Sequence, residues 1–428
     1  MRTHSTGDFT LRRGFMRNIF LALLSGGALI VSLACMNNQN IPIGYAKPGQ
    51  TVKELVDSLP PTGGTVSLGI GTWSSGYNST DLITKPNITI QGSGMPGYNS
   101  TFTAMTGGTI LQGHLPASTG ADYFTVRDLG VDAGSAYIDA NNGGVATDAF
   151  AIYNSGQVLG APQVESPWIE NVSCLGYSPN AAAHCILVEN VNHAYVHNVV
   201  AVMNCHGVVL KGTNSTVDGV YSRGHGIDSI IVKSDNYAPA SQDHLSNIVI
   251  EPLIAAGDTK GIVIQGVAAP LSNISVSNAV IRSPLAWGVY VQGANSTTAA
   301  TSLNFSNITV EYPGGSPIVE YCMQLVQYVS AVNINNLNCS NMWAGIAPYA
   351  AVSGAFNDFT LTNSHFTNIA TNGIETFGQW SVVDNRFESI AGSGIVADSG
   401  VTTVSENRFT NVGTDMYPNG GTFVVSTP

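Results

Sequence analysis

Ionisable side chains recur at two fixed positions around a series of short apolar runs in this chain. One column stands two residues before each run and consists of Asp148, His184, His206, Asp228, Lys260 and Trp287. The other column closes each run and consists of Tyr153, Glu189, Lys211, Lys233, Gln265 and Gln292. Charged residues make up only 10% of the chain, so chance does not explain five successive ionisable residues in the first column. Carboxylates and imidazoles can donate and accept protons, and ammonium groups can neutralise an anionic substrate.

Histidines give a second indication of the same region. Six of the nine histidines fall between residues 184 and 244. We therefore take as catalytic candidates Asp148, His184, His206 and Asp228. The candidates for substrate binding are Glu189, Lys211, Arg223, His225, Lys233 and Trp287. Trp287 could belong to a sugar-stacking strip with Tyr290, Trp343 and Tyr349, or these aromatics could be ordinary residues of a coil face.

The elements that must position these columns are short β-branched runs broken by Gly or Asn. Runs that open with a small residue start at 207, 229, 261, 288, 345, 373 and 394, and runs that open with Asn alternate with them. Their spacing of 21 to 32 residues, with one gap of 57 that fits two coils, predicts a β-solenoid without intervening helices. Equivalent residues of successive coils then lie about 4.8 Å apart. Asn tolerates left-handed turns and stacks in ladders, so we interpret the many Asn-x-Ser/Thr triplets as structural.

The segment before the first coils carries the pattern of a cap. An amphipathic stretch over 49–59 is followed by Gly63-Gly64-Thr65-Val66-Ser67-Leu68 and by Gly71-Thr72-Trp73. This arrangement resembles the N-terminal cap of right-handed parallel β-helix proteins. We expect an all-β chain, a single-stranded right-handed parallel β-helix with a short N-terminal capping helix. The expected division is an export signal over 1–34, a linker over 35–50, the cap and first strands over 51–85, and the β-helix over 86–428.

The first residues have the pattern of an export signal. The apolar run over 19–34 is short for a membrane span, and Leu11–Arg17 ahead of it resembles the twin-arginine export motif. Ser32-Leu33-Ala34 is a small-x-small cleavage site, and Cys35 directly after it could carry a lipid. An uncleaved N-terminal anchor is the alternative. We expect an exported protein, periplasmic, at the cell surface or extracellular, that meets a membrane only through a lipid on Cys35.

Charge and cysteine usage exclude several classes of protein. The net charge of −12 disfavours a nucleic-acid partner. The six cysteines show no CxxC spacing, so no zinc or redox site is indicated, and with Cys35 set aside an odd number remains. Ligation of a metal by His184, His206 and Asp228 is an alternative that we weigh less. We expect no cofactor, a polysaccharide as the partner, and a monomer.

The column region resembles a known family at the level of short motifs. Polygalacturonases, glycoside hydrolases on the β-helix fold, carry NTDG, DDC, GHG and RIK in succession, and the similar segments here are 147–150, 183–186, 205–208 and 231–233. By this resemblance Asp148 is a catalytic carboxylate, His206 the active-site histidine and Lys233 a substrate-binding lysine. Both aspartates of the second motif are replaced here, by Ala183 and His184. The resemblance therefore implies a polysaccharide-acting protein of altered polygalacturonase-like type.

Three functions remain open on these residues. An inverting hydrolase needs two carboxyl groups about 6.5–9.5 Å apart, and Asp228, three coils from Asp148, lies roughly 14 Å away. The second carboxylate could come from a loop, with Asp132, Asp139 and Asp218 as candidates. A lyase would need a base, His206 or His225, and cations from Lys211, Lys233 and Arg223. A non-catalytic polysaccharide-binding or adhesion protein is the third possibility.

The two columns also raise a question of direction. They are five positions apart, so on one flat strand they would face opposite sides of the sheet. Either a bend separates them, or the His/Asp column points inward as a buried hydrogen-bonded ladder. The pair Glu189 and Lys211 is most simply a surface ion pair between neighbouring coils.

Overall fold

The computed structural model describes residues 43–77, 81–132, 150–152, 162–176, 184–202, 206–224, 228–234, 240–251, 260–284, 286–313, 321–349 and 356–426. The expected export signal, Cys35, Asp148 and His225 lie outside the described residues. Residues 42–428 form one compact unit. In the described part of the chain, no helix has the length and apolar character needed to cross a membrane.

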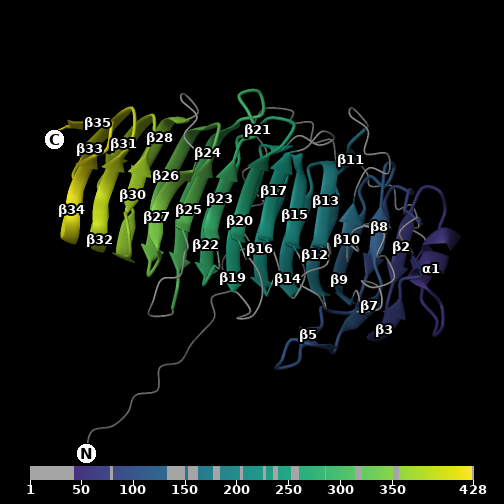
Figure 1. Cartoon of the computed structure of the whole chain (residues 1–428). Helices are drawn as coiled ribbons and strands as arrows, with labels where there is room; N and C mark the ends of the chain where they lie inside the picture. The colour runs from purple at the N-terminus through teal and green to yellow at the C-terminus, as the bar shows by residue number, and fades with distance from the viewer. Residues whose placement is uncertain are drawn as a thin grey trace, which may run out of the picture. The chain divides into compact units, whose positions relative to one another are not determined.

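The chain forms a right-handed parallel β-helix in which each strand pairs with the equivalent strand of the next coil (Figure 1). What we call the first sheet contains β8 (Leu115–Ala117), β10 (Phe150–Ile152), β13 (His184–Asn192), β15 (His206–Thr213), β17 (Asp228–Ser234), β20 (Lys260–Gly266), β23 (Trp287–Gln292), β25 (Tyr321–Val326), β27 (Ala344–Tyr349) and β30 (Ile374–Thr376). The pairing follows the alignment predicted from the sequence, because Ile186, Val208, Ile230, Ile262 and Val289 stand in register.

The remaining faces are built mainly from long strands that bend along their length. They are β9 (Thr125–Asp132), β12 (Trp168–Leu175), β14 (Tyr195–Val202), β16 (Thr216–Arg223), β19 (His244–Glu251), β22 (Ser275–Arg282), β24 (Ala300–Glu311), β26 (Val329–Ser340), β32 (Arg386–Ala397) and β34 (Arg408–Pro418). In β9, β12, β14, β16, β19 and β22 we call the half before the bend the second sheet and the half after it the third sheet, and β24 and β26 continue both sheets. By contrast, β32 and β34 start on the third sheet and end on the first sheet, in register with β30. The bend in β12 and β14 falls at Asn171 and Asn198, whose φ angles are 53° and 49°.

Shorter strands complete the coils at both ends and at the corners. They are β1 (Ile43–Tyr45), β2 (Gly64–Ser67), β3 (Gly71–Ser74), β4 (Ile88–Gln91), β7 (Thr109–Gln112), β11 (Val164–Glu165), β18 (Ala240–Ser241), β21 (Leu271–Ser272), β28 (Phe356–Thr362), β29 (His365–Ile369), β31 (Gln379–Val383), β33 (Val401–Ser405) and β35 (Thr422–Val425). A small antiparallel hairpin of β5 (Gly97–Tyr98) and β6 (Met105–Thr106) contacts the third sheet, where the Tyr98 hydroxyl donates to the Cys174 carbonyl at 2.7 Å. Residues 43–45, placed in a linker by the sequence analysis, form β1 and pair with β2.

Asparagines at the bends stack from coil to coil, as the sequence analysis predicted. The Asn198 side-chain amide donates to Asn171 at 2.7 Å, and Asn307 and Asn336 continue the same pattern at 3.0 and 2.9 Å. Each of these residues adopts the left-handed conformation that Asn tolerates better than most side chains. Gly219, with a φ of 68°, takes the equivalent place in β16. The Asn repeat is therefore a structural ladder along the bends of successive coils.

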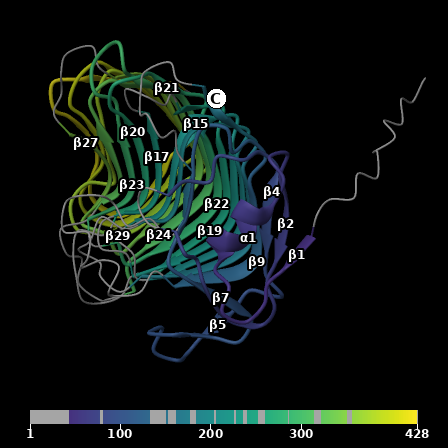
Figure 2. The same cartoon turned by 90° about the vertical axis from the view of Figure 1, so that its right-hand side faces the viewer.

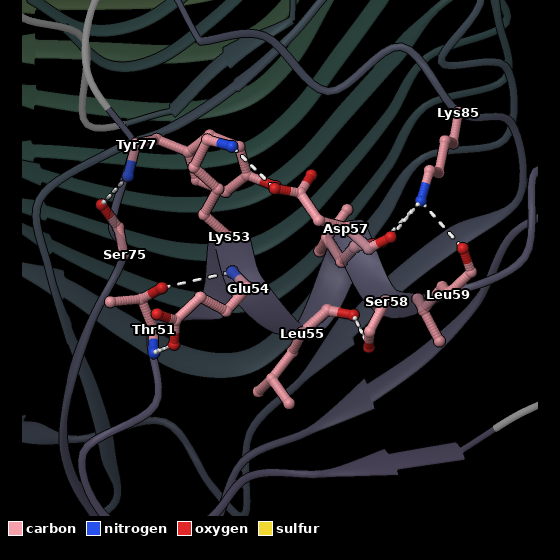
Figure 3. A network of polar contacts seen from close by, with 11 residues as sticks. Thr51, Lys53, Glu54, Leu55, Asp57, Ser58, Leu59, Ser75, Tyr77 and Lys85 are labelled. Atoms are coloured by element: carbon pink, nitrogen blue, oxygen red, sulfur yellow. Dashed lines mark hydrogen bonds and ion pairs between the residues drawn. The ribbon is translucent and has the colours of Figure 1, made fainter.

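A short helix, α1 (Val52–Ser58), covers the N-terminal end of the coils, as expected (Figure 2). Thr51 caps the helix, because its hydroxyl accepts from the Glu54 amide while the Glu54 carboxylate accepts from the Thr51 amide (Figure 3). At the other end, the Lys85 ammonium donates to the carbonyls of Val56, Asp57 and Leu59 at 2.8–2.9 Å. Both sets of helix-terminal backbone groups thereby find partners. The helix shields the open edge that the first coil would expose.

One continuous apolar core fills the coils from the cap to the last described strands. In the C-terminal coils it contains a ladder of stacked rings, Phe366, Phe387 and Phe409, with centroid distances of 5.2 and 5.1 Å. Two disulfides, Cys174–Cys185 and Cys322–Cys339, join the third sheet to the first. The sequence had left these pairings open, and the remaining Cys205 lies outside the described residues.

Candidate functional site

The outer face of the first sheet carries three columns of side chains. Ile186 and its neighbours in register point into the main core, so the alternate residues point outward. A middle outer column is apolar and forms a separate buried cluster of Leu187, Val209, Ile231 and Val263, against which Tyr290 packs. Ionisable residues flank it on one side at the strand starts, and polar residues flank it on the other side at the strand ends. The two columns derived from the sequence thus border one apolar strip.

A break in the strand pairing shows whether the column of His184, His206 and Asp228 faces outward or into the core. His184, His206, Asp228 and Lys260 stand in register, and pairing resumes only two residues later at Ile186, Val208, Ile230 and Ile262. The skipped residue, Cys185 in the first of these strands, belongs to the core. The ammonium of Lys260 lies near Tyr290, which packs on the outer strip. A bend therefore separates the columns and both lie on the outer face, so the alternative of an inward His/Asp ladder is wrong.

Asp228 is the centre of the first column. Its carboxylate lies 3.5 Å from His206 Nδ1 and 3.3 Å from Lys260 Nζ, and its side chain is only 8% exposed. Burial raises the pKa of Asp228 above its ordinary value, although the nearby cations Lys260 and Lys233 act in the opposite direction. His184 stacks on His206 with ring centroids 4.8 Å apart. The strands thus bring together three of the four predicted catalytic residues, and Asp148 lies outside the described part.

Aromatic side chains extend this cluster toward the next coil. The Lys260 ammonium lies 5.1 Å from the ring centroid of Trp287 and 5.5 Å from that of Tyr290. The two rings are 5.1 Å apart, and the Tyr290 hydroxyl donates to Gln292 at 3.0 Å. Burial, with Asp228 nearby, raises the pKa of Tyr290, so this hydroxyl keeps its proton. The arrangement places a cation, an acid and two aromatic rings over neighbouring coils. We name this group, His184, His206, Asp228, Lys260, Trp287 and Tyr290, the first-sheet cluster.

The second column contains pairs of side chains that bind one another. Glu189 and Lys211 lie 2.6 Å apart with side chains 4% and 16% exposed, so this ion pair is largely buried and not the surface pair expected from the sequence. Lys233, Gln265 and Gln292 follow in register, and Gln265 donates to Gln292 at 2.8 Å. Lys233 is close enough to Asp228 for its positive charge to lower the pKa of that carboxyl, against the larger effect of burial.

Arg223 does not lie on this face. It ends β16 on the third sheet, with its guanidinium 4.4 Å from the ring centroid of Phe102. Lys211 and Lys233 lie on first-sheet strands, whereas Arg223 follows the bend at Gly219 and so points from another sheet. Arg223 therefore takes no part in the first-sheet cluster. Of the loop carboxylates considered from sequence, Asp218 lies on the second sheet, Asp132 ends β9 on the third, and Asp139 is outside the described residues.

The histidines that gather in the sequence separate in space. His184 and His206 belong to the first sheet, whereas His197 and His244 lie on the second sheet and His193 lies between β13 and β14. Because these histidines are close in sequence, the sequence analysis assigned them to one region, although they belong to two different sheets. Lys260 was recognised in the column but not chosen as a site residue, and Tyr290 was considered only as a stacking aromatic. Lys260 could have been chosen from the column itself, whereas Tyr290 stands in register with Val263 in the apolar middle column, where no feature of the sequence indicated a site residue.

The described cluster offers acid–base and electrostatic chemistry. Burial favours the protonated form of Asp228, an imidazole such as His206 can accept a proton, and Lys260 can stabilise an anion. No group of three His, Cys, Asp or Glu side chains that could hold a metal ion occurs among the residues with described positions.

Comparison with protein-family models and with curated protein sequences finds no match. Among solved structures, a GH87 alpha-1,3-glucanase catalytic domain in complex with tetrasaccharides is similar, with a TM-score of 0.54 and 12% identity over 91% of this chain and 69% of that chain. The Agl-KA catalytic domain is similar at a TM-score of 0.52 and 13% identity, over 89% of this chain and 66% of that chain. At such identities the likeness concerns the fold alone. It confirms the right-handed parallel β-helix that the sequence predicted.

Proposed function

We propose that this protein is a polysaccharide-degrading enzyme whose substrate lies along the outer face of the first sheet, across β15, β17, β20 and β23. The observation that carries the proposal is the contact of buried Asp228 with both His206 and Lys260, next to Trp287 and Tyr290. A row of equivalent positions on successive coils suits a polymer, and aromatic rings pack against the C–H faces of sugars. The similar solved structures include glucanase catalytic domains with bound oligosaccharides, which is consistent with this class of partner.

Hydrolysis is the first candidate reaction. Asp228, with its raised pKa, would donate its proton to the glycosidic oxygen as the bond to the anomeric carbon breaks. Water would attack the anomeric carbon and lose its proton to a second carboxylate. The register from β10 to β17 places the strand that follows Asp148 three coils from the strand that follows Asp228, roughly 14 Å, which exceeds the separation that an inverting pair uses. The pair Asp148 and Asp228 therefore does not fit an inverting hydrolase, which makes the second carboxylate the open requirement of this reaction.

β-Elimination of a uronic acid polymer is the second candidate, favoured by the presence of an imidazole and a cation on either side of Asp228. His206 would remove the proton from the carbon beside the sugar carboxylate, and Lys260 would neutralise that carboxylate. The C–H electron pair would form the new double bond as the glycosidic oxygen leaves. Asp228 would protonate the leaving oxygen, so this reaction needs no second carboxylate.

We further propose that the protein acts after export, as a monomer, with residues 1–34 as the signal and Cys35 as a possible site of lipid attachment. This part of the proposal rests on the sequence pattern of residues 11–35. Mass spectrometry of the protein recovered from its native envelope would show an N-terminus at or near Cys35 if the proposal is right, and an intact Met1 if it is wrong.

The purified protein should be incubated with acidic and neutral polysaccharides while two signals are followed. New reducing ends without ultraviolet absorbance would indicate hydrolysis, and both signals together would indicate β-elimination. Asp228→Asn should abolish either signal. Glu388→Gln, a change at an exposed ion pair with Arg386 in a distant coil, is the matched control. No signal on any polymer, from protein that is folded, would favour the binding or adhesion function instead.

A further inference from the structure

A second group of exposed aromatic side chains lies on the second sheet. Trp168 and Tyr195 occupy equivalent positions of β12 and β14, with ring centroids 4.2 Å apart, and His197 stacks on Tyr195 at 5.6 Å. Trp168 is 42% exposed, and Tyr123, at the corner before β9, is 56% exposed. The residues between them, Ile169 and Val196 among others, are buried in the core. Large rings are thus presented outward on neighbouring coils.

Hydrogen-bonding groups flank these rings. The Trp168 indole N–H donates to Glu170 at 3.1 Å, and His197 lies 3.6 Å from Glu170 and 3.5 Å from Asp218. The hydroxyl of Ser246, which donates to Asp218, is the largest influence that lowers the pKa of that carboxyl below its ordinary value. Glu170 and Asp218 are therefore acceptors held at fixed positions beside the rings. We name Trp168, Glu170, Tyr195, His197 and Asp218 the second-sheet patch.

The fold itself does not require aromatic residues at these positions. Further along the same column the residues are Thr216, His244, Ser275 and Asn304, all polar. An exposed tryptophan leaves apolar ring surface in contact with water, and clustered exposed aromatics commonly mark interaction sites. Since the coils stack equally well with small polar residues, the rings at 168 and 195 call for an explanation outside the fold.

Charge limits what this surface can bind. Glu165, Glu170 and Asp218 are carboxylates, and Glu165 lies 3.7 Å from exposed His193. The guanidinium of Arg127, in register with Glu170, donates to Gln91 in the preceding coil. A polyanion would be repelled by this arrangement, whereas sugar hydroxyls would donate to the carboxylates. The apolar C–H face of a sugar ring would pack on Trp168 and Tyr195.

We propose that the second-sheet patch is a binding site for a neutral polysaccharide, separate from the first-sheet cluster. The two lie on different sheets of the coil, because Trp168 belongs to the β12–β14 ladder and Asp228 to the β15–β17–β20 ladder. A chain held at Trp168 therefore does not occupy the face that carries Asp228. The site holds polymer without cleaving it, since its carboxylates and its imidazole are engaged with one another and with the Trp168 indole. It raises the local concentration of substrate when the same polymer reaches the first sheet.

Affinity gel electrophoresis of the full protein tests this proposal. The probes are mixed-linkage β-glucan, galactomannan, xylan and a soluble α-glucan as neutral polymers, with polygalacturonate and alginate as acidic ones. We expect retardation by at least one neutral polymer. Trp168→Ala should raise the apparent Kd at least about tenfold, and Glu170→Gln should weaken binding less. Tyr417→Ala is the matched control, because Tyr417 is a similarly exposed aromatic residue, 50%, in β34 at the far end of the coils.

The outcomes separate this site from the proposed enzyme. Retention of all retardation in Trp168→Ala, or retardation by the acidic polymers alone, would overturn the proposal, as would no retardation by any neutral polymer. Asp228→Asn should bind neutral polymer like the wild type. If the wild type binds through Trp168 but cleaves nothing, the binding site stands and the enzymatic function fails. Near-ultraviolet circular dichroism of each variant checks that the β-helix is intact.

Discussion

The buried carboxyl of Asp243, at a corner of the β-helix, should make the stability of the protein depend on pH. Asp243 is fully buried, and its Oδ1 accepts from the Ser215 amide at 2.9 Å, while its Oδ2 has no hydrogen-bond partner among the described residues. Burial raises the pKa of Asp243 from its ordinary value of 3.8 to about 8, against the smaller effect of the Ser215 bond. A later coil holds Asn385 in the same arrangement, where its Oδ1 accepts from the Ser364 amide at 2.9 Å and its Nδ2 donates to carbonyls.

The direction in which pH changes the stability follows from the protonation of Asp243 in the folded and unfolded states. Above pH 4 the carboxyl of Asp243 ionises in the unfolded chain but keeps its proton in the folded one, so stability falls as the pH rises. The loss continues until about pH 8, where the folded state also ionises, and is constant above that. At about 1.4 kcal/mol per pH unit, the full cost is roughly 6 kcal/mol. Local opening of the corner lowers the measurable part to roughly 2–6 kcal/mol.

Asp243→Asn should therefore stabilise the protein, and only above about pH 4. Denaturant unfolding of the wild type and the variant at pH 4, 6 and 8 should show a gap that widens as the pH rises. Asn385→Asp, the reverse change in the same local arrangement at a different bend, should produce a new loss of stability with the same pH dependence. A gap between wild type and Asp243→Asn that does not change with pH would refute the account of the buried carboxyl.

The remaining predictions concern the cap, the core and the site. Lys85→Met should lower stability by about 2 kcal/mol, because three carbonyls at the end of α1 lose a charged donor; an unchanged unfolding midpoint in urea would contradict this. Phe387→Ala should cost about 3–5 kcal/mol by opening a cavity between Phe366 and Phe409, and a calorimetric loss below about 1 kcal/mol would show that the stack is dispensable. Asp228→Asn should reduce turnover about 100- to 10 000-fold. Wild-type turnover should fall as the pH rises through the raised pKa of Asp228, since the acid must be protonated, and a profile that rises there instead would exclude it as the acid.

The sequence was sufficient for the fold and for the register of the first sheet. The β-branched runs bury alternate residues, so a shift of the register by one residue would expose the core. For this reason the pattern of apolar residues along the sequence is sufficient to align Ile186, Val208 and Ile230. The Asn residues marked the bends for a physical reason as well, since few other side chains accept a left-handed φ.

The site was only partly predictable, because a linear pattern does not show which sheet a residue occupies. His197 and His206 are nine residues apart in sequence but belong to different faces of the coil. From the sequence, Arg223 was expected to bind substrate together with Lys211, but the bend at Gly219 places Arg223 on the third sheet. The pairing of Cys174 with Cys185 across a corner and the outer apolar strip around Val209 also depend on coil geometry that residue types alone do not encode.

Release of reducing ends and of ultraviolet-absorbing product, measured side by side for the wild type, Asp228→Asn and Lys260→Met, tests the central claim most directly. The account predicts that the wild type degrades at least one polysaccharide, that Asp228→Asn is inactive, and that Lys260→Met is strongly impaired while both variants stay folded. Full activity in Asp228→Asn would contradict the claim that the first-sheet cluster is the active site.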